Sequence, residues 1–466
     1  MFSYLEAKRL LRCPIEFLNE SLTIRSLSID TRTLCPGDLF VALQGERSDG
    51  HEFLASAFEK GASGALLDIR RKDELLAHAR NNKMKIKNLI FVQDAQASMA
   101  LLATEYRKKL SVRVIGITGS VGKTTTKEFL YYLLRQKFST LATTGNLNNH
   151  LGVPIMLSRL EASHDFCVME MGASHLQEIR YLAGLAAPLG GILTPIGPAH
   201  LAGFGSLENV YEAKLELVDS LPPKGPLVVP DNDERLLHKL QQKKRRAVTV
   251  GFSDCAEYKI TDVHAKDEEV FFRLCERGPF SFSGQAPFLA LNAGLAIAMA
   301  LSLGFSWEEL PLQWKDVGFA SGRFRETILS NGVRIIDDSY NANPVSFQNA
   351  LSAFQLLPRT GKKIIVFADM LELGPEENRF HQELGQRIAV SAVDIALAFG
   401  KRTQISVEAI RSLGSGCDAS HFESPEEILD VLKKVLRPGD RVLFKGSRSM
   451  HVEKILEGVR AFPLFL

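Results

Sequence analysis

The sequence lacks the cysteine patterns that build zinc sites and disulfide frameworks. Its 466 residues include six cysteines, and no pair of them has the Cys-x-x-Cys spacing that is typical of a zinc site. The six are scattered along the chain, which argues against a fold that is stabilised by disulfides. This distribution suits a protein that works in a reducing compartment.

Strong charge of either sign is also absent. The formal net charge is +2, which gives no general attraction to nucleic acid or to an anionic membrane. A phosphate ligand must therefore be held by a local site, and we expect no nucleic-acid partner. The N-terminal run MFSYLEAKRLL carries charges where a signal peptide needs an apolar core, so we expect a cytoplasmic protein.

One apolar stretch has nearly the length of a membrane span. Residues 286–305 are mostly apolar, and about twenty such residues can cross the hydrocarbon core of a bilayer. Pro287, Asn292 and Gly294 interrupt the stretch, and alanine is frequent in it. We therefore predict the end of a strand followed by a buried helix. We also expect the apolar tail, residues 462–466, to pack on the last domain.

The chain is long for one hydrophobic core. With 45% hydrophobic and 24% charged residues it has the composition of a soluble globular protein, and its length suggests several domains. Short strand-like runs between turns indicate a small N-terminal α/β domain over residues 1–106. A strand, a glycine loop and a helix then open a central domain, which we predict over residues 107–318.

The last part of the sequence alternates apolar strands with helical stretches. The strands are predicted within residues 332–340, 362–370, 392–400 and 439–447. This alternation indicates a mostly parallel sheet that is covered on both faces. We therefore predict an α/β fold of three domains: the N-terminal domain, a central P-loop ATPase domain with a parallel sheet, and a C-terminal Rossmann-like domain over residues 319–466.

A glycine loop at the start of the central domain gives the strongest chemical signal. The loop reads Thr118-Gly119-Ser120-Val121-Gly122-Lys123-Thr124-Thr125. Its glycines let backbone N–H groups converge on phosphate oxygens, and the positive end of the following helix adds to this attraction. In such loops the lysine reaches the β- and γ-phosphates and the next hydroxyl binds Mg²⁺, so we assign these roles to Lys123 and Thr124.

The match to the general phosphate loop is incomplete. The general pattern has glycine at the position of Ile117, and a tight turn that contains Gly-Lys-Thr by chance is the alternative. An ATP site also leaves the reaction open, because motors, kinases, switches and ligases all use one.

Three ionisable residues follow the loop within the predicted central domain. Glu170 ends an apolar strand, where α/β sheets place their ligand-binding residues, and a carboxylate there suits Mg²⁺. His200 and Lys214 come next along the chain. Each residue has a structural alternative: Glu170 could cap a helix, His200 could be a satisfied loop residue, and Lys214 could be a solvated helix residue.

Together these segments resemble the Mur ligase family, and the resemblance covers essentially the whole chain. Members activate a carboxylate with ATP and couple it to an amino group. The resemblance implies two Mg²⁺ ions, one held by Thr124 and Glu170 and the other by His200 and a carbamylated Lys214. Such a carbamate forms when CO₂ adds to a deprotonated lysine, which turns a cation into an oxygen-donor anion. The ATP contacts implied in the loop are Thr118, Gly119, Ser120, Gly122, Lys123, Thr124 and Thr125, and the catalytic residues are Lys123, His200 and Lys214.

Within the family, the chain is similar to the branch that adds D-alanyl-D-alanine to UDP-N-acetylmuramoyl-tripeptide in peptidoglycan synthesis. Residues 28–53 are similar to that branch's UDP-substrate domain, and residues 143–154 to its acceptor-sugar loop. Ordinary turns, which Asp-Gly pairs and asparagine side chains readily form, are the alternative for both runs. The side chains that the resemblance implies near the acceptor are Ser28, Asp30, Arg32, Asn146, Asn148 and Asn149.

The C-terminal domain carries further segments of this branch. DDSYNANPVS at residues 337–346 is the most discriminating, together with ADMLELG at 368–374 and FKGSRSM at 444–450. The sibling that adds a diamino acid usually has an Asp-Asn-Pro-Arg run, which this chain lacks. The resemblance implies that this domain binds the incoming amine. The residues implied are Arg323 for an ATP phosphate, Asp338 for ribose, Asn292 beside adenine, and Tyr340, Asn341 and Asn343 for substrate.

Two positions depart from the family pattern. The family usually has a His-Asn pair shortly before the position of Asn292, and this chain has Phe288 and Leu289 there. After Lys214 the family usually reads Gly-Glu-Ile, and here the sequence is Leu-Glu-Leu. The first departure affects the predicted contact of Asn292 with adenine. The second changes the residues that follow Lys214.

The implied reaction needs no enzyme nucleophile. The acceptor carboxylate attacks the γ-phosphate to give an acyl phosphate and ADP, and the amine then attacks the acyl carbon and releases phosphate. Lys123 and the two metal ions supply the positive charge that the first step requires. Water must be kept from the acyl phosphate, so we expect the third domain to close over the site, with Gly318, Ser321 and Gly322 as the hinge. We expect a monomer.

Three other interpretations stay open from sequence. A sibling ligase that adds a diamino acid would differ in its amine specificity. A polyglutamate ligase would share the central chemistry but would lack the N-terminal domain expected from residues 28–53. A nucleotide-binding regulatory module would keep the phosphate loop but would need neither His200 nor Lys214.

Overall fold

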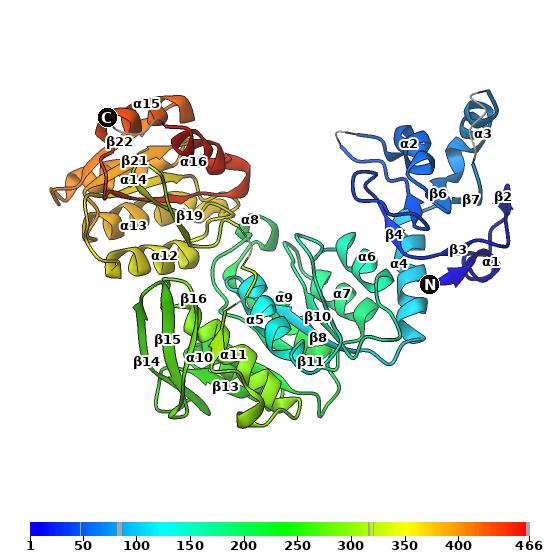
Figure 1. Ribbon diagram of the computed structural model, residues 1–466, viewed down its shortest axis with the longest axis horizontal. Helices are drawn as coiled ribbons and strands as arrows, with labels where there is room; N and C mark the ends of the chain where they lie inside the picture. Colours follow the sequence, from blue (N-terminus) through cyan, green and yellow to red (C-terminus); the bar gives the residue numbers. More distant parts are fainter. Residues whose placement is uncertain (47, 82–85, 316, 320, 463–466) are drawn as a thin grey trace. The chain divides into compact units, whose positions relative to one another are not determined.

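The structure is a computed structural model that describes residues 1–46, 48–81, 86–315, 317–319 and 321–462 (Figure 1). The predicted packing of the apolar tail falls largely on residues 463–466, which lie outside the described residues. By its internal contacts the chain forms two units. The first comprises residues 1–116, 138–172 and 178–189, and the second comprises residues 117–137, 173–177 and 190–466.

The first unit contains a five-stranded sheet with the order β2-β7-β6-β5-β4. Neighbours from β4 to β7 run parallel, whereas β2 is antiparallel to β7. Its core gathers the large side chains Phe40, Leu67 and Phe91, all buried. The strands are β2 (Ile15–Glu16), β4 (Leu27–Ser28), β5 (Leu39–Val41), β6 (Gly64–Asp68) and β7 (Leu89–Val92).

Short helices cover this sheet, and one longer helix leads out of it. Asp94 caps the longer helix, α4 (Ala95–Lys108), because its side chain accepts a hydrogen bond from the N–H of Ala97. Ser3 and Glu6 form a capping box at the first helix. The remaining elements are β1 (Phe2–Ser3), which pairs with β3 (Thr23–Ile24), and the helices α1 (Tyr4–Leu11), α2 (Leu54–Glu59) and α3 (Lys72–Asn81).

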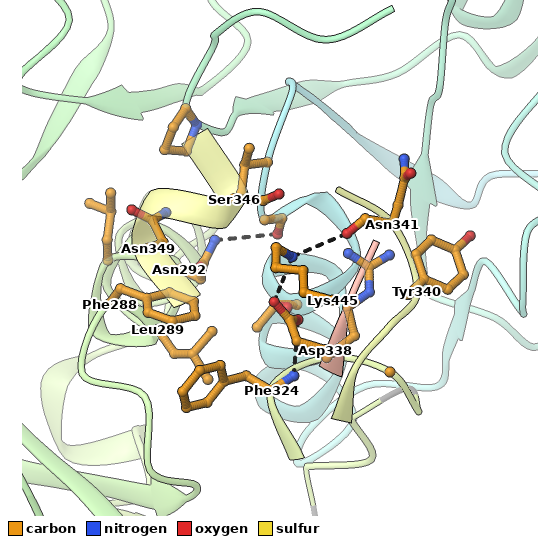
Figure 2. Close-up of a pocket in the computed structure, with 17 residues that line it drawn as sticks. Phe288, Leu289, Asn292, Phe324, Asp338, Tyr340, Asn341, Ser346, Asn349 and Lys445 are labelled. Atoms are coloured by element: carbon orange, nitrogen blue, oxygen red, sulfur yellow. Dashed lines mark hydrogen bonds and ion pairs between the residues drawn. The ribbon is translucent and has the colours of Figure 1, made fainter. Parts of the chain in front are cut away.

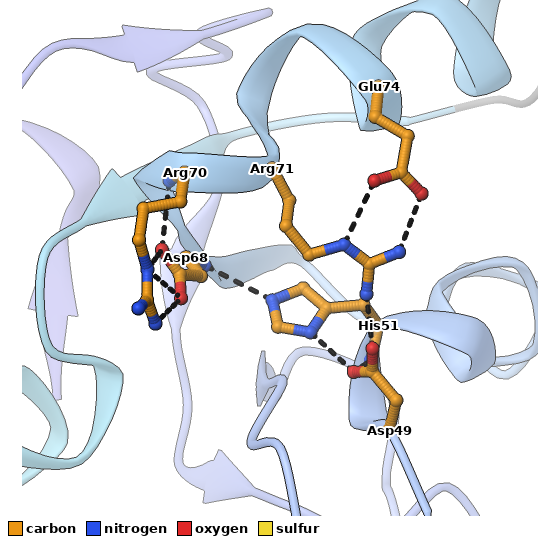
Figure 3. A network of polar contacts seen from close by, with 6 residues as sticks. All are labelled: Asp49, His51, Asp68, Arg70, Arg71 and Glu74. Carbon is orange, nitrogen blue, oxygen red and sulfur yellow. Dashed lines mark hydrogen bonds and ion pairs between the residues drawn. The ribbon is translucent and has the colours of Figure 1, made fainter.

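A buried histidine fixes the turn at Asp49 and Gly50 (Figure 3). The Nε2 of His51 accepts a hydrogen bond from the backbone N–H of Asp68 at 3.2 Å, so the proton lies on Nδ1, which donates to Asp49 at 2.6 Å. The guanidinium of Arg71 then contacts the other oxygen of Asp49. This part of the N-terminal segment is therefore held by a network of buried and half-buried polar groups.

The first unit also includes a parallel pair of strands, β9 (Thr140–Ala142) and β10 (Phe166–Glu170). Helices α6 (Gly152–Ser158) and α7 (Glu178–Ala186) pack against α4. The hydroxyl of Tyr106 donates to the carbonyl of Leu160, and Arg107 donates to the carbonyl of Ala186. The three predicted domains are residues 1–106, 107–318 and 319–466. Their bounds stay predictions, because the internal contacts divide the chain into two units with other bounds.

Strand β8 (Arg113–Thr118) leads from the first unit into the second, where helix α5 (Lys123–Leu134) follows. The strands of the second unit that precede residue 318 have the order β17-β16-β15-β14-β13-β12-β11. The strands β11 (Gly190–Leu193), β12 (Leu227–Pro230) and β13 (Val248–Gly251) run parallel, as predicted. The helices between them are α8 (Leu201–Phe204), α9 (Leu207–Asp219) and α10 (Glu234–Gln242).

An antiparallel extension of this sheet was not predicted. It consists of β14 (Tyr258–Lys266), β15 (Glu269–Leu274) and β16 (Arg277–Ser283), with β17 (Gln313–Trp314) at its edge. The apolar stretch at residues 286–305 forms the buried helix α11 (Leu289–Ser302), as predicted, but the strand before it ends at Ser283. Among the described residues, no helix is long and apolar enough to cross a membrane.

Aromatic packing attaches the helix after the glycine loop to this extension. The ring of Phe129 on α5 lies 4.8 Å from that of Phe282, 5.2 Å from Trp314 and 5.3 Å from Phe319, all in edge-to-face geometry. Such pairs contribute about 0.5–1.5 kcal/mol each beyond the burial of their area. Helix α5 is therefore held in place by rings from three later segments.

The C-terminal part of the second unit is a six-stranded sheet with the order β18-β19-β23-β20-β21-β22. The four predicted strands are confirmed, and all pairs except β18 with β19 are parallel. The strands are β18 (Arg325–Ile328), β19 (Arg334–Asp338), β20 (Lys363–Ala368), β21 (Ile395–Phe399), β22 (Asp418–Phe422) and β23 (Arg441–Lys445). The helices are α12 (Pro344–Leu356), α13 (Glu377–Ala389), α14 (Thr403–Ser412), α15 (Pro425–Val435) and α16 (Val452–Arg460).

The two edge strands β18 and β22 were missed by the sequence analysis. The first reads Arg-Glu-Thr-Ile and the second reads Asp-Ala-Ser-His-Phe, so both lack the continuous apolar run of the central strands. The carboxyl ends of β19, β23 and β20 are adjacent in the sheet, so the loops after them lie together at one edge.

The stability of this sheet should depend on pH through His381, which is fully buried on α13. Its Nε2 accepts a hydrogen bond from the N–H of Met370, its Nδ1 donates to the carbonyl of Glu377, and burial lowers its pKa below the usual value. The unfolded chain therefore takes up a proton first as the pH falls. Stability is fully present above pH ~6.5 and decreases below it, by at most about 1.4 kcal/mol per pH unit for this one proton.

Urea unfolding of the wild type and of His381→Gln between pH 7.5 and 5.0 measures this contribution. We expect the difference in unfolding free energy between the two proteins to shrink as the pH falls. The exposed His238 on α10 gives a matched control, and His238→Gln should follow the wild-type pH curve. A difference that stays constant with pH would contradict the assignment to His381.

Candidate active site

The glycine loop turns sharply between β8 and α5. Gly119 has a φ of +149° and Gly122 a φ of +87°, values that favour glycine. A Cβ on Gly119 would lie 2.1 Å from the hydroxyl of Thr194, and one on Gly122 would lie 2.2 Å from the amide of Asn292. Both positions therefore require glycine, for conformation and for space.

The N-terminus of α5 carries no side-chain cap, because Gly122 is its N-cap residue. Its first N–H groups and its dipole therefore suit an anion. The Nζ of Lys123, the first residue of the helix, donates to the carbonyl of Gly119 at 2.8 Å. The ammonium group is thus folded back over the loop, at the place where a phosphate would lie.

Asn292 supports the loop from helix α11. Its side-chain amide donates to the hydroxyl of Thr126 at 2.9 Å and to the carbonyl of Gly122 at 3.3 Å. The residue is buried, and it also lines the cavity next to the loop. The side chain predicted beside adenine therefore positions the glycine loop, and its contact with a base stays a prediction.

Arg323 brings a second cation to the loop. Its guanidinium donates to the hydroxyl of Thr124 at 3.0 Å and stacks on the ring of Tyr340, with 4.1 Å between the guanidinium carbon and the ring centroid. The Nε of Arg323 is buried and has no hydrogen-bond partner within the described part of the chain. A buried donor without a partner is costly, so an acceptor such as a phosphate oxygen would be favourable here.

Asp338, at the end of β19, forms a buried ion pair (Figure 2). Its carboxylate contacts the ammonium of Lys445 at 2.6 Å and accepts a hydrogen bond from the N–H of Phe324. Lys445 also donates to the carbonyl of Asn341. Burial raises the pKa of Asp338, and the charge of Lys445 opposes this effect.

One cavity is lined by Asn292, Arg323, Asp338 and Lys445 among these groups (Figure 2). It is lined by the glycine loop, the start of α11, residues 322–324, the end of β19 and Lys445. Phe288 and Leu289 line one side of the cavity, so this side is apolar. Polar groups at one end and an apolar wall at the other suit a nucleotide, whose phosphates and base need these two surroundings.

His200 and Lys214 lie in the same unit as the loop. His200 precedes α8 with a φ of +53°, and its Nδ1 contacts the carboxylate of Glu372. Burial lowers the pKa of His200, and the nearby charges of Lys123 and Lys214 lower it further, whereas Glu372 raises it. A neutral imidazole at physiological pH is the form that binds a metal.

Lys214 is buried on helix α9, with an exposed fraction of 2%. Its Nζ donates to the carbonyl of Ala173 at 3.4 Å and lies 5.2 Å from the ring centroid of Phe204. Lysine is among the residues that are almost never fully buried without a partner. The solvated-helix alternative for this residue is therefore wrong.

Glu170 belongs to the first unit, at the end of β10. Its exposed fraction is 2%, and one carboxylate oxygen accepts a hydrogen bond from the side-chain amide of Asn148 at 2.8 Å. The other oxygen, Oε2, is buried without a hydrogen-bond partner among the described residues. A buried carboxylate oxygen that lacks a donor suits a cation, so this residue fits the Mg²⁺ role expected of it.

The residues expected near the acceptor are engaged in local turns. Ser28 donates to the carbonyl of Asp30, and the carboxylate of Asp30 holds the guanidinium of Arg32 at 2.7 Å. The side chain of Asn149 accepts from the N–H of Gly152 at 2.9 Å, and Asn146 is exposed. These side chains therefore form the local turn contacts that the sequence offered as an alternative. Their contacts with substrate stay predictions.

The three residues expected near the incoming substrate differ in their contacts. The ring of Tyr340 supports Arg323, as described above, and Asn341 is exposed at the mouth of the nucleotide cavity. Asn343 forms a capping box with Ser346 at the start of α12. A cap of this kind has a structural role by itself, so substrate binding by Asn343 stays a prediction.

The sequence did not reveal two residues of the site and one contact. It named neither Lys445, which pairs with Asp338, nor Glu372, which contacts His200, and it did not foresee that Asn148 holds Glu170. The first two lie within segments that had been singled out, FKGSRSM and ADMLELG. Their roles depend on contacts between residues far apart in the sequence, which no local pattern gives.

Three family models match the chain. The Mur ligase family catalytic domain matches residues 23–105, the Mur ligase middle domain matches residues 117–300, and the Mur ligase glutamate ligase domain matches residues 322–448. The middle-domain match contains the glycine loop, Glu170, His200, Lys214 and Asn292. The third match begins at Gly322, next to Arg323.

Individual relatives extend over nearly the full chain. The UDP-N-acetylmuramoyl-tripeptide–D-alanyl-D-alanine ligase of Bacillus subtilis (strain 168) is 33% identical over 446 residues, which cover 96% of this chain and 95% of the relative. A crystal structure of MurF from Acinetobacter baumannii has a TM-score of 0.83 at 28% identity and covers 99% of both chains. The MurF ligase from Thermotoga maritima in complex with ADP has a TM-score of 0.75 at 29% identity and covers 94% of this chain and 97% of that one.

The geometry of the loop predicts the effect of a single methyl group. Gly119→Ala would place a Cβ against Thr194 at a φ that alanine avoids, so the loop must shift. We expect the Kd for ATP to rise by about 10-fold or more, since backbone strain and a displaced donor each weaken phosphate binding. Titration calorimetry with ATP measures this change.

Gly184→Ala is the matched control. Gly184 lies in helix α7, and an added Cβ there meets no atom within 4 Å. This variant should bind ATP as the wild type does and be slightly more stable, because alanine is the better helix former. Equal ATP affinities for the Gly119 and Gly184 variants would refute the assigned role of the loop.

Proposed function

The chain belongs to the Mur ligase family, and on this premise we propose that it adds D-alanyl-D-alanine to UDP-N-acetylmuramoyl-tripeptide while ATP is converted to ADP and phosphate. The observation that carries the proposal is similarity to ligases of this activity over nearly the whole of both chains. The cavity beside the glycine loop supports the ATP-dependent part, because it combines phosphate-binding groups with an apolar wall.

The first step joins two anions and therefore needs positive charge. The terminal carboxylate of the tripeptide attacks the γ-phosphorus of ATP, the bond to the β,γ-bridging oxygen breaks, and ADP leaves. Lys123 lies over the loop and Arg323 lies at Thr124, so two cations are present where the phosphates would lie. Fixed charges of this kind stabilise the transition state without having to reorganise.

The second step forms the amide bond. The amino group of D-alanyl-D-alanine, after loss of a proton, attacks the carbonyl carbon of the acyl phosphate and gives a tetrahedral intermediate. Collapse of this intermediate expels phosphate and leaves the pentapeptide product. The substrates supply both the nucleophile and the leaving group, so the enzyme needs only to orient them, to stabilise charge and to exclude water.

Two Mg²⁺ ions are part of the proposal, and the donor groups fit them. Thr124 and Glu170 would hold one ion, and His200 with a carbamylated Lys214 would hold the other. The unpartnered oxygen of Glu170 and the lowered pKa of His200 support these roles. When bound, such ions neutralise the phosphate oxygens of ATP.

The remaining contacts follow the same assignment. In the nucleotide cavity, Asn292 would lie beside adenine, Arg323 would bind a phosphate and Asp338 would bind ribose. The acceptor would be bound by Ser28, Asp30 and Arg32 at its uridine diphosphate and by Asn146, Asn148 and Asn149 at its sugar. The hinge at Gly318, Ser321 and Gly322, the monomeric state and the cytoplasmic location belong to the same proposal.

Loss of the loop cation tests the phosphoryl-transfer step. Lys123→Ala should lower pentapeptide formation by about 10³-fold or more, because the transition state loses a preorganised charge. Purified protein is incubated with ATP, Mg²⁺, UDP-N-acetylmuramoyl-tripeptide and D-alanyl-D-alanine, and the products are weighed by mass spectrometry.

The exposed Lys224 gives the matched control, and Lys224→Ala should retain the wild-type rate. Phosphate release by the wild type should require both the tripeptide and the dipeptide. If ATP turns over equally without them, the ligase proposal fails. Full product yield from a folded Lys123→Ala protein would reject the role of the loop lysine.

The carbamate on Lys214 makes a separate prediction. Lys214→Ala should lower the ligation rate by about 10²-fold or more, and added acetate should restore part of it, since a small carboxylate can fill the space and supply an oxygen donor. The Mg²⁺ dependence of ATP binding, measured by calorimetry, should weaken in the variant and recover with acetate. No recovery by acetate in a folded variant, together with full activity of the wild type in buffer free of CO₂, would exclude the carbamate.

A further inference from the structure

A second cavity lies between helices α12 and α13, which lie side by side over the C-terminal sheet (Figure 1). The two helices connect β19 to β20 and β20 to β21, and these strands follow one another in the same direction across the sheet. Right-handed crossovers therefore place both helices on the same face. The described residues that line the cavity include none of those assigned to ATP, to metal ions or to either substrate.

The walls of the cavity are apolar because each helix turns one stripe of side chains toward it. Residues four positions apart lie on the same face of a helix. Phe347 and Leu351 form the stripe of α12. Phe380 and Leu384 form the stripe of α13, and all four side chains are buried. Met370, which follows β20, adds a thioether, a group that adapts its shape to what it contacts.

Two contacts hold these walls in place. The ring of Phe347 lies 6.1 Å from the ring of Phe367 on β20, in edge-to-face geometry. The backbone N–H of Met370 donates to the buried imidazole of His381 at 3.1 Å, which ties the segment after β20 to α13. Sites for small molecules are usually preformed in this way, because a ligand then binds without ordering its surroundings.

The outer rim of the cavity is polar. Gln348 and Arg387 are exposed there. Glu383 also lines the cavity, and its carboxylate lies 3.5 Å from the guanidinium of Arg379. Arg387 has neither an ion pair nor a hydrogen bond from its side chain in the part of the chain that the structure describes. The charge left at the rim is therefore positive, and an anion that is attached to an apolar group would complement it.

The volume of the cavity limits the size of the ligand. It is about 170 Å³, and a cavity of about 150 Å³ with leucine, isoleucine and phenylalanine walls holds one benzene molecule. One aromatic ring therefore fits between the helices, and a short chain can reach the rim. A small zwitterion suits the cavity poorly, because its ammonium group would lie against buried apolar side chains.

We propose that this cavity is a binding site for a small aromatic carboxylate, with the ring between α12 and α13 and the carboxylate at the guanidinium of Arg387. The ring would restore contacts that apolar side chains facing a cavity lack. The charge-assisted hydrogen bonds to Arg387 would fix the orientation of the ligand. This site goes beyond the proposed function, because its ligand is neither a substrate nor a product of the ligation.

The test follows the methyl group of Met370 by NMR in full-length protein labelled with ¹³C-methyl methionine. The resonance is assigned as the one that is missing in Met370→Leu. Titration with 3-phenylpropanoate should shift it to saturation with a Kd of roughly 1 mM, as expected for a ligand of this size. 3-Phenylpropanamide, which has the ring without the charge, should bind about 3-fold or more weakly, because it loses an exposed ion pair. Propanoate, which lacks the ring, should bind about 10-fold or more weakly.

Two variants separate the rim from the apolar interior. Arg387→Gln should bind the acid as weakly as the amide. Leu384→Trp should fill the cavity and abolish the shift. The matched control is Arg460→Gln at an exposed position at the end of α16, which should bind as the wild type does. The buried Met99 of the first unit should keep its resonance throughout.

Three outcomes would overturn the proposal: no saturable shift of Met370 with the acid, equal affinities for the acid and the amide, or an unchanged affinity for the acid in Arg387→Gln. If Leu384→Trp does not fold, the comparison of acid and amide in the other two proteins still decides. None of these measurements requires ligation, so the proposed function can fail while this site stands.

Discussion

Close approach of the backbone at Gly119 and Gly122 is the constraint on which the candidate site depends. A Cβ on Gly119 would collide with Thr194, and a Cβ on Gly122 would collide with Asn292. The loop can therefore pack against these two residues only if both positions are glycine. The helix that follows begins without a side-chain cap, and its N-terminus faces the space that the loop encloses. The phosphate-binding geometry is therefore determined by contacts on both sides of the loop and by the aromatic packing of α5.

The second organising feature is the pairing of polar and charged side chains across long sequence separations. Asp338 is compensated by Lys445, 107 residues later in the chain. His200 contacts Glu372 over a separation of 172 residues. Lys445 is buried, and an isolated buried charge would be costly. The contact between His200 and Glu372 joins the central and C-terminal segments of the second unit. Contacts between segments that are distant in the sequence therefore assemble the candidate site.

The sequence predicted the parts of the fold that are encoded locally. Apolar runs identified the central strands, and the glycine loop identified the start of α5. The antiparallel strands β14 to β16 and the edge strands β18 and β22 were missed, because their alternating or polar patterns resemble those of surface loops. At the site, glycine and lysine spacing located the loop. The partners Lys445 and Glu372 were missed, and Asn148 was predicted at the acceptor and not as a partner of Glu170, because these contacts arise only when distant segments fold together.

Arg323 is held at the glycine loop from two sides, and this support matters for the chemistry. Arg323 stacks on Tyr340 and donates to Thr124, so its position is fixed before a nucleotide arrives. A fixed cation is suited to charge that develops during phosphoryl transfer, where reorganisation would slow the reaction. A rigid phosphate site of this kind agrees with the proposed reaction, in which activation of the carboxylate comes first and coupling follows.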